Sequence, residues 1–413
     1  MNRVKQLLNR YTSVSLVSRI LIGLVLGALL GLLLPKWTFV SILGRMFVSA
    51  LRGIAPVLVA VLVISSLARA NGGLGRRFGV LVAIYLFSTF IAAVCAVVGS
   101  FLFPVTLDLE GVEVAIQPDS RAGRLSEVFT NLLTSMVDNP VSAIVNANYI
   151  SILFWSIILG VALRTTASKA TVQVVNDLSD VVSRVVKCII QFAPFGILGL
   201  VFTTVSQNGL SVFVTYGHLL LLLLACMLVN TFVFNPLISF ALVHRNPYPL
   251  LFTCLKESGL QAFFTRSSAA NIPINMALCK KLGLDDEFYS VSIPLGATIN
   301  MDGAAVTITV FSLAVAHTLG IDVSFGSALF LGVVATLGAC GASGVAGGSL
   351  LLIPMACSFF GIGSDVAMQA VAIGFIVGVV QDSVETALNS SGDAFFTATA
   401  EYYDRRVKSS HIQ

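Results

Sequence analysis

Charged residues are scarce in this chain of 413 residues, where Asp, Glu, Lys and Arg together make up 11% of the sequence. A soluble domain carries roughly 25% of them, so the composition excludes an ordinary soluble globular protein. Hydrophobic residues make up 56%, and the mean hydropathy is +0.94. The sequence therefore predicts an all-α polytopic membrane protein, whose spans would each need about 20 apolar residues.

Recognisable metal and catalytic patterns are also missing. The seven cysteines are scattered and form no Cys-x-x-Cys, which favours neither a metal site nor a disulfide framework. No nucleophile stands beside a general base, so an enzyme is the least favoured class. The net charge of +4 comes from lysines and arginines in loops rather than from a basic patch, so nucleic acid is not an expected partner.

Long apolar segments recur along the chain, and we interpret them as membrane spans. Eight are predicted, at about residues 17–34, 40–67, 80–103, 128–162, 177–205, 212–243, 291–319 and 366–399. No small-x-small site precedes Pro35, so the first is expected to be a span rather than a cleaved leader. The fourth is interrupted at Asp138-Asn139-Pro140, and Pro194 should kink the fifth.

Lysine and arginine gather in alternate loops. If the spans alternate in direction, these loops fall on one side and the acidic loop 105–127 falls on the other. The basic residues concerned are Arg3, Lys5, Arg10, Arg69, Arg76, Arg77, Arg164, Lys169, Arg245, Arg405, Arg406 and Lys408. The positive-inside rule then predicts that both termini, including the tail 405–413, are cytoplasmic.

Two further segments, 249–280 and 325–361, have their least apolar residues in the middle. The first centres on T-R-S-S-A-A-N at 265–271, and the second on a glycine-rich run at 338–349. A straight span should not be polar at mid-membrane, whereas the tip of a re-entrant hairpin must be lined by protein or water. We therefore predict two re-entrant helical hairpins.

The second half of the chain repeats one unit, a hairpin followed by a span with a polar break. The breaks are predicted at Asn300-Met301-Asp302-Gly303 and at Asn389-Ser390-Ser391-Gly392-Asp393. The common order favours an inverted repeat. Interrupted segments in both halves are the sequence feature that best indicates a transporter binding site.

The last span carries a polar stripe. Asp382, Thr386, Asn389 and Asp393 fall within an arc of about 60° on a helix, with Glu385 at its edge. A charge at mid-bilayer costs about 2.5–3.5 kcal/mol even on the lenient scale, so such residues usually mark an ion or substrate path. A satisfied contact within the helix bundle, or a frayed end at the membrane surface, is the alternative.

The predicted breaks suit a hard cation. Unwound backbone carbonyls and the side-chain oxygens of Asn300, Asp302, Asn389 and Asp393 favour Na⁺, and no Cys or His accompanies them. Asp302 has the alternative role of a helix cap beside Gly303. Asn389 has the alternative role of a buried hydrogen bond between helices.

The hairpin tips suit an amino acid. They offer N–H groups and the hydroxyls of Ser267, Ser268, Ser343 and Ser349 for a carboxylate, although Ser343 and Ser349 equally suit tight packing. Asp382 is the candidate partner of a substrate ammonium group. For Arg266, a role as charge partner of one of the acids is favoured over direct contact with substrate.

The motifs T-R-S-S, G-A-T-I-N-M-D-G, A-S-G-V-A-G-G and N-S-S-G-D, in this order and spacing, resemble the dicarboxylate/amino acid:cation symporter family. The resemblance covers essentially the whole chain. It implies a homotrimer in the bacterial inner membrane with the glutamate-transporter-like inverted-repeat elevator fold, in which eight transmembrane helices accompany the two hairpins. Residues 1–210 would be mostly scaffold, and residues 211–404, joined by span 80–103, would form the moving transport domain.

The resemblance also implies site residues. The Na⁺ ligands would be Gly296, Asn300, Asn389 and Asp393 at one site, Thr298 with tip carbonyls of Ala339, Cys340 and Ala342 at a second, and Ser88, Thr89, Asn300 and Asp302 at a third. The substrate contacts would be Ser268, Val345, Asp382, Thr386 and Asn389, with Glu385 beside them.

Three positions depart from the family pattern. Glu385 stands where members that carry acidic substrates place an arginine, Ala304 replaces a common threonine, and Ala346 replaces a common proline. The first departure argues against an acidic substrate. We therefore expect Na⁺-coupled import of small neutral L-amino acids, with serine and threonine as the expected substrates. A cation-coupled carrier of dicarboxylates or acidic amino acids is the alternative of the same fold, and a channel or receptor-like membrane protein is the alternative of another class.

Overall fold

The computed structural model describes residues 14–69, 75–109, 137–340, 342 and 347–410. Within these ranges every regular element is helical. The helices are α2 (Leu16–Leu33), α3 (Ser41–Arg69), α4 (Gly75–Leu102), α6 (Pro140–Val145), α7 (Tyr149–Thr166), α8 (Lys169–Gln191), α9 (Ala193–Asn208), α10 (Val212–Val229), α11 (Asn235–Val243), α12 (Tyr248–Cys254), α13 (Leu260–Thr265), α14 (Ser268–Lys281), α15 (Asp286–Ile299), α16 (Asp302–Thr318), α17 (Phe325–Ala339), α18 (Ile353–Ser358) and α19 (Ser364–Ser410).

Several of these helices are suited to a membrane. Five in the described chain are long and apolar enough to cross one, at Thr38–Ser65, Arg77–Leu102, Phe213–Val243, Asp286–Thr318 and Ser364–Lys408. Helices α8 and α9 make a sixth if they are taken as one span bent by 52°. The bend adjoins Pro194, as expected. The shorter apolar helices Ser18–Leu33 and Ser151–Thr166 coincide with the first predicted span and with the second half of the fourth.

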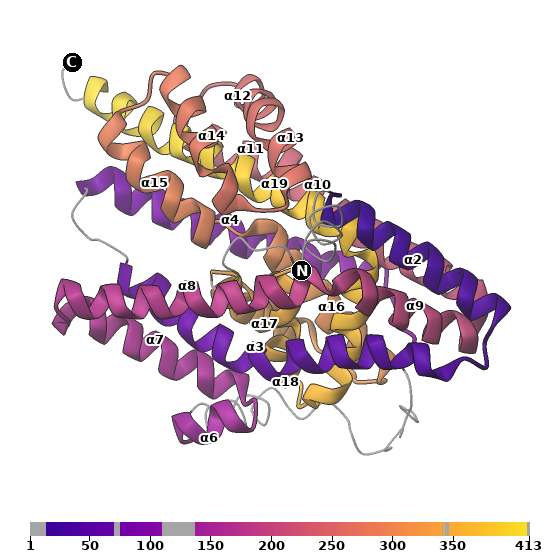
Figure 1. Cartoon of the computed structure of the whole chain (residues 1–413). Coiled ribbons are helices and arrows are strands. Elements are labelled where there is room, and N and C mark those ends of the chain that lie inside the picture. Colours follow the sequence, from indigo (N-terminus) through magenta and orange to yellow (C-terminus); the bar gives the residue numbers. More distant parts are fainter. Residues whose placement is uncertain (1–13, 70–74, 110–136, 341, 343–346, 411–413) are drawn as a thin grey trace, which may run out of the picture.

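The helices pack in two groups. Helix α2 lies along α9, and α3 packs against α7, α8 and α9. The second group surrounds α19, which contacts α4, α10 to α16 and α18. In Figure 1, α12 to α15 gather around the C-terminal part of α19, and α7 and α8 lie apart from them.

Glycines allow the first group to pack closely. A Cβ atom built on Gly23 would lie 2.2 Å from the carbonyl oxygen of Pro194, and one on Gly27 would lie 2.5 Å from that of Leu198. Gly199 meets α3 in the same way, because its Cβ would lie 2.4 Å from the nitrogen of Gly44. Small residues at such crossings replace side-chain bulk with backbone contact, which is how helices associate where apolar lipid gives no hydrophobic drive.

Both predicted hairpins take the form of paired helical arms. The first descends through α12, the π-helical turn η4 (Leu255–Gly259) and α13, and returns as α14. At its tip Arg266 adopts a left-handed conformation with φ 51°, and the side chain of Ser267 caps α14. The second runs along α17 and returns through η5 (Ser349–Leu352) and α18. Much of its tip, residues 341 and 343–346, lies outside the described residues.

The predicted break at residues 300–303 is confirmed, because α15 ends at Ile299 and α16 begins at Asp302. The predicted break in the last span is wrong. Helix α19 continues without interruption for 47 residues, through Asn389 to Asp393. Gly392 serves close packing there rather than unwinding, since a Cβ at this position would lie 2.8 Å from Nδ2 of Asn300.

Replacing Gly27 with alanine should separate α2 from α9. We expect Gly27→Ala to lower the free energy of unfolding by about 1–3 kcal/mol, the usual cost of overpacking, seen as a lower thermal midpoint in detergent. Gly53 is the matched control, because nothing lies within 4 Å of its Cβ position in α3. Gly53→Ala should be neutral or stabilising, since alanine is the better helix former. Equal losses in both variants would contradict the packing argument.

Candidate functional site

The polar stripe of α19 is fully inside the protein. Asp382, Glu385, Thr386, Asn389 and Asp393 are all buried, each at most 6% exposed. A frayed helix end at the surface is thereby excluded. The break between α15 and α16 lies against this stripe: the backbone N–H of Gly303 donates to Oδ1 of Asn389 at 2.8 Å. The first turn of α16 is thus held by a side chain of the facing helix.

One predicted ion site is assembled around Asp393. Nδ2 of Asn300 donates to Oδ1 of Asp393 at 3.0 Å and to the carbonyl oxygen of Asn389 at 3.2 Å. Gly296 leaves room for Asp393, because a Cβ there would lie 2.8 Å from the same Oδ1. Two buried oxygens, Oδ1 of Asn300 and Oδ2 of Asp393, have no hydrogen-bond partner among the described residues. Such oxygens are costly to bury unless a further group satisfies them.

The predicted site around Asp302 is assembled in part. Oδ2 of Asp302 accepts from the Ser88 hydroxyl at 2.6 Å, and Oδ1 accepts from the Thr89 hydroxyl at 3.1 Å. The side chain of Asn300, expected here, bonds to Asp393 instead. Two further donors were not predicted from the sequence. Nδ2 of Asn230 and Nδ2 of Asn235 donate to Oδ2 of Asp302 at 2.9 and 3.0 Å.

A local irregularity brings those two amides together. Asn230 begins the π-helical turn η3 (Asn230–Phe234), and Asn235 follows it, so both side chains face Asp302. Both are buried. In the sequence, Asn230 and Asn235 stand out as two amides in an otherwise apolar span. Regular helical spacing, however, would place them on different faces of the helix.

The predicted ion site of Thr298, Ala339, Cys340 and Ala342 lies where the second hairpin meets α15. The Cys340 thiol is 3.7 Å from the carbonyl oxygen of Ile299, the residue after Thr298. Ala339 and Ala342 are buried, and the N–H of Ala342 donates to the carbonyl of Ala339. The structure therefore brings this tip to the end of α15.

Asp382 is held by both hairpins. The Arg266 Nε donates to its Oδ2 at 2.6 Å, and the Gly347 N–H donates to its Oδ1 at 3.2 Å. The side chains of Arg266 and Asp382 are 9% and 3% exposed. The favoured interpretation of Arg266 as a charge partner is confirmed. Its Nη2 also donates to the carbonyl of Gly378, whereas its buried Nη1 has no partner among the described residues.

Glu385 accepts hydrogen bonds from a separate set of side-chain donors. Its Oε2 accepts from Thr307 at 2.8 Å, Ser349 at 2.9 Å and Gln381 at 2.5 Å. Arg266 bonds to Asp382 rather than to Glu385. The hydroxyl of Ser349 thus has a polar role beyond tight packing.

The remaining predicted substrate residues are placed less completely. Ser268 and Thr386 are buried, at the start of α14 and on the stripe of α19. Val345 lies outside the described residues. The first hairpin also binds α19 through contacts that the sequence reading missed: Nδ2 of Asn271 and of Asn275 donate to the Ser390 hydroxyl at 2.8 and 3.1 Å.

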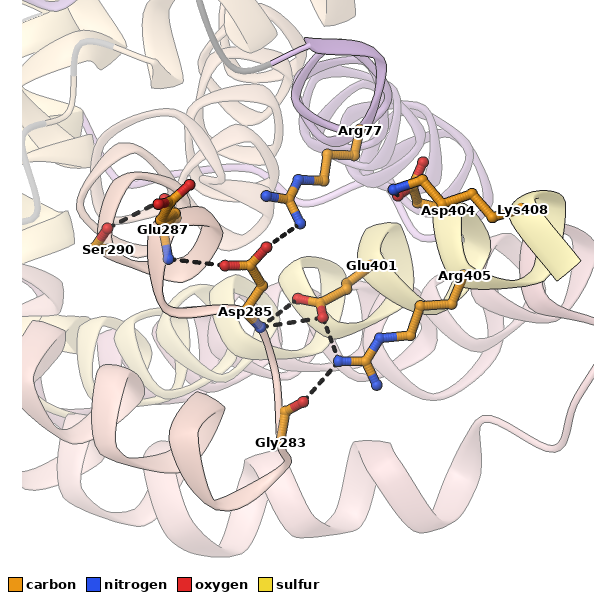
Figure 2. Close-up of polar contacts among 9 residues, drawn as sticks. All are labelled: Arg77, Gly283, Asp285, Glu287, Ser290, Glu401, Asp404, Arg405 and Lys408. Atoms are coloured by element: carbon orange, nitrogen blue, oxygen red, sulfur yellow. Dashed lines mark hydrogen bonds and ion pairs between the residues drawn. The ribbon is translucent and has the colours of Figure 1, made fainter.

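Charged side chains fasten the far end of α19. Figure 2 shows Arg77 of α4 reaching Asp285, whose backbone N–H donates to the Glu401 carboxylate. Arg405 bonds to Glu401 and to the carbonyl of Gly283. The hydrogen bond from Arg77, 2.6 Å long, holds the pKa of Asp285 below its usual range. This network ties α4, the α14–α15 turn and α19 together.

Comparison with known proteins identifies relatives along nearly the full length. Residues 16–402 match the model of the sodium:dicarboxylate symporter family. The chain is 56% identical to a serine/threonine transporter SstT of Bifidobacterium adolescentis, over 95% of this chain and 91% of that one. It is 53% identical to one of Streptococcus thermophilus over 96% and 98%, and 55% identical to one of Enterococcus faecalis over 95% and 92%.

The hydrogen bond from Asn235 to Asp302 should be a measurable part of stability. We expect Asn235→Ala to lower the free energy of unfolding by about 1.5–3 kcal/mol, the range for hydrogen bonds to a charged group, measured by thermal unfolding in detergent. Ser239→Ala is the control on the same helix, since the partner of Ser239 among the described residues is the neutral Thr399 hydroxyl at 2.9 Å. It should cost less, about 0.5–1.5 kcal/mol. A larger loss in the control would refute the assignment.

Proposed function

The chain belongs to the sodium:dicarboxylate symporter family, a family of membrane transporters rather than enzymes, and from this premise we propose that it couples Na⁺ entry to the uptake of small neutral L-amino acids, serine and threonine above all. The cation is cargo here rather than a resident cofactor. The observation that carries the proposal is a pair of buried oxygens with no hydrogen-bond partner among the described residues, Oδ1 of Asn300 at the break between α15 and α16 and Oδ2 of Asp393 on the facing α19.

The donor set at that break fits Na⁺. Carboxylate, amide and carbonyl oxygens are ligands for hard cations, and they are supplied here by Asp393, Asn300 and the backbone of Gly296 and Asn389. The described residues contain no group of three or more His, Cys, Asp or Glu side chains arranged to hold a metal ion. A bound cation would satisfy both orphaned oxygens at once. This would remove the cost of burying the Asp393 charge without a cationic partner.

The other two proposed ion sites receive different degrees of support. Thr298, Ala339, Cys340 and Ala342 lie at the meeting of α15 and the second hairpin, where backbone carbonyls are available. Around Asp302 both carboxylate oxygens already accept hydrogen bonds, from Ser88 and Thr89 among others. An ion there would share Asp302 with those donors, so we propose that this site binds Na⁺ more weakly than the other two.

The substrate is proposed from charge and from the relatives. Asp382 offers its carboxylate to an ammonium group, and Nη1 of Arg266, buried beside it, offers a donor to a carboxylate. Ser268, Thr386, Asn389 and Val345 would complete the contacts. An acidic substrate would also have to approach Glu385. The relatives described above are serine/threonine transporters, which supports this proposal.

The proposed architecture follows from the same premise. We propose eight transmembrane helices and two re-entrant hairpins, with α2, α3 and α7 to α9 as scaffold and α4 with α10 to α19 as the moving domain. The two packing groups described above support this division. The homotrimer, the bacterial inner membrane and the cytoplasmic termini belong to the proposal as well.

The direct test of the proposed coupling is uptake of labelled serine into proteoliposomes. Accumulation only with an inward Na⁺ gradient is expected, and gradient-independent equilibration would refute the coupling.

Asp393 should control the Na⁺ dependence of uptake. Asp393→Asn removes the charge and nearly keeps the shape, so we expect a rise of at least about tenfold in the Na⁺ concentration for half-maximal serine uptake, equivalent to 1.4 kcal/mol or more. Glu257→Gln is the control, since Glu257 pairs with Lys281 on the half-exposed outside of the first hairpin. It should leave the dependence unchanged. An unaltered Na⁺ dependence in Asp393→Asn would remove this residue from the ion sites.

Glu385 should exclude acidic substrates. A substrate carboxylate near this buried acid would cost several kcal/mol if both stayed ionised, so aspartate should compete poorly with labelled serine in the wild type. Glu385→Gln removes the charge while Thr307 and Ser349 still find an acceptor, and we expect aspartate competition to improve about tenfold or more. Glu385→Arg should improve it further but slow serine uptake. Strong competition by aspartate in the wild type would overturn the neutral-substrate assignment.

A further inference from the structure

A cavity with a strongly basic lining opens where α11 and α19 end. Its volume is about 620 Å³. The described residues that line it are Val243, His244, Arg245, Tyr402, Arg405 and Arg406. Three of the six are arginines and none is acidic. Neither the ion sites nor the substrate residues involve this cavity, so the proposed function leaves it without a role.

The arginines on α19 are held in place by neighbouring groups. Nη1 of Arg406 donates to the carbonyl oxygen of Leu242, at the C-terminal end of α11, at 2.8 Å. Arg405 uses Nη2 for its bonds to Glu401 and Gly283, and its guanidinium lies 5.9 Å from the centre of the Tyr402 ring. Figure 2 shows this fastening of Arg405. A guanidinium carries five N–H donors, and the contacts of Arg405 described here use one nitrogen.

Two acids beside the lining are paired within α19, Glu401 with Arg405 and Asp404 with Lys408. Arginine stays protonated in proteins near neutral pH. Its planar donors match the oxygens of a phosphate group in pairs. The chemistry of the lining therefore selects an anion with several oxygens.

The position of the cavity indicates the source of that anion. Two candidate membrane spans end at its edge, Phe213–Val243 and Ser364–Lys408. It therefore lies at the level of lipid headgroups, where tyrosines such as Tyr402 are also enriched. Basic pockets between transmembrane helices are known to receive anionic headgroups. We infer that this cavity binds a phosphate-bearing anion, supplied by the headgroup of an anionic phospholipid or by phosphate in solution.

The two sources are separated by offering each to the purified full-length protein. Native mass spectrometry counts the lipids retained from an equal mixture of phosphatidylglycerol and phosphatidylcholine. Thermal unfolding in inorganic phosphate, compared with chloride at the same ionic strength, measures the binding of phosphate from solution. The variants are Arg245→Gln and Arg406→Gln. Lys169→Gln is the control, because Lys169 is an exposed cation at the start of α8, in the other packing group.

We expect the wild type and Lys169→Gln to retain phosphatidylglycerol in preference, and each cavity variant to lose that preference about tenfold, as for one charge-assisted contact. Stabilisation by phosphate alone, lost in the same variants, would assign the site to a solute anion. Equal retention of both lipids with no effect of phosphate, or losses no larger in the cavity variants than in Lys169→Gln, would overturn the inference. Arg245 makes none of the fastening contacts described above, so Arg245→Gln should remain folded and the result interpretable.

Discussion

The structure depends on the cost of burying carboxylates inside apolar helices. Five acids of the described chain, Asp302, Asp382, Glu385, Asp393 and Glu401, lie in the interior at 5% exposure or less. Each charge must be met by donors or by a cation, because an isolated ionised group in such surroundings is prohibitively unfavourable. No single helix can supply those donors. The acids therefore determine which elements have to meet, and α19, which carries four of them, contacts most of the second packing group.

Each acid draws on different elements. Asp302 binds α4, η3 and α11, whereas Glu385 binds α16, η5 and its own helix. Asp393 is the exception, since its only side-chain donor is Asn300 and one of its oxygens has no partner among the described residues. Satisfied acids act as structural anchors, and the unsatisfied one is the position where a transported cation gains most. This difference separates the framework from the proposed ion site.

The sequence predicted the parts that follow from composition and local pattern. Both hairpins, the bend near Pro194 and the break after Ile299 follow from where polar residues, proline and glycine interrupt apolar runs. It failed where tertiary contacts decide. The predicted break at residues 389–393 is absent, and Gly392 instead gives Asn300 room against an intact α19. The donors Asn230 and Asn235 depend on a π-helical turn, which shifts the helical register by one residue and leaves no simple periodic signal. The sequence predicts that Arg266 pairs with one of the acids. That this partner is Asp382 rather than Glu385 is decided by the fold.

Asp382 connects the two hairpins, and this has a consequence for how they could open. One of its oxygens binds the first tip through Arg266, and the other binds the second tip through the N–H of Gly347. The ion pair is the stronger contact, since both partners are charged and buried. The single backbone bond from Gly347 has a neutral donor and is longer, so it is the contact that a substrate ammonium group would replace at least cost. An arriving amino acid would therefore leave the first tip fastened to α19 and release the second. The asymmetry between the hairpins thus lies in the chemistry of the two donors that share one carboxylate.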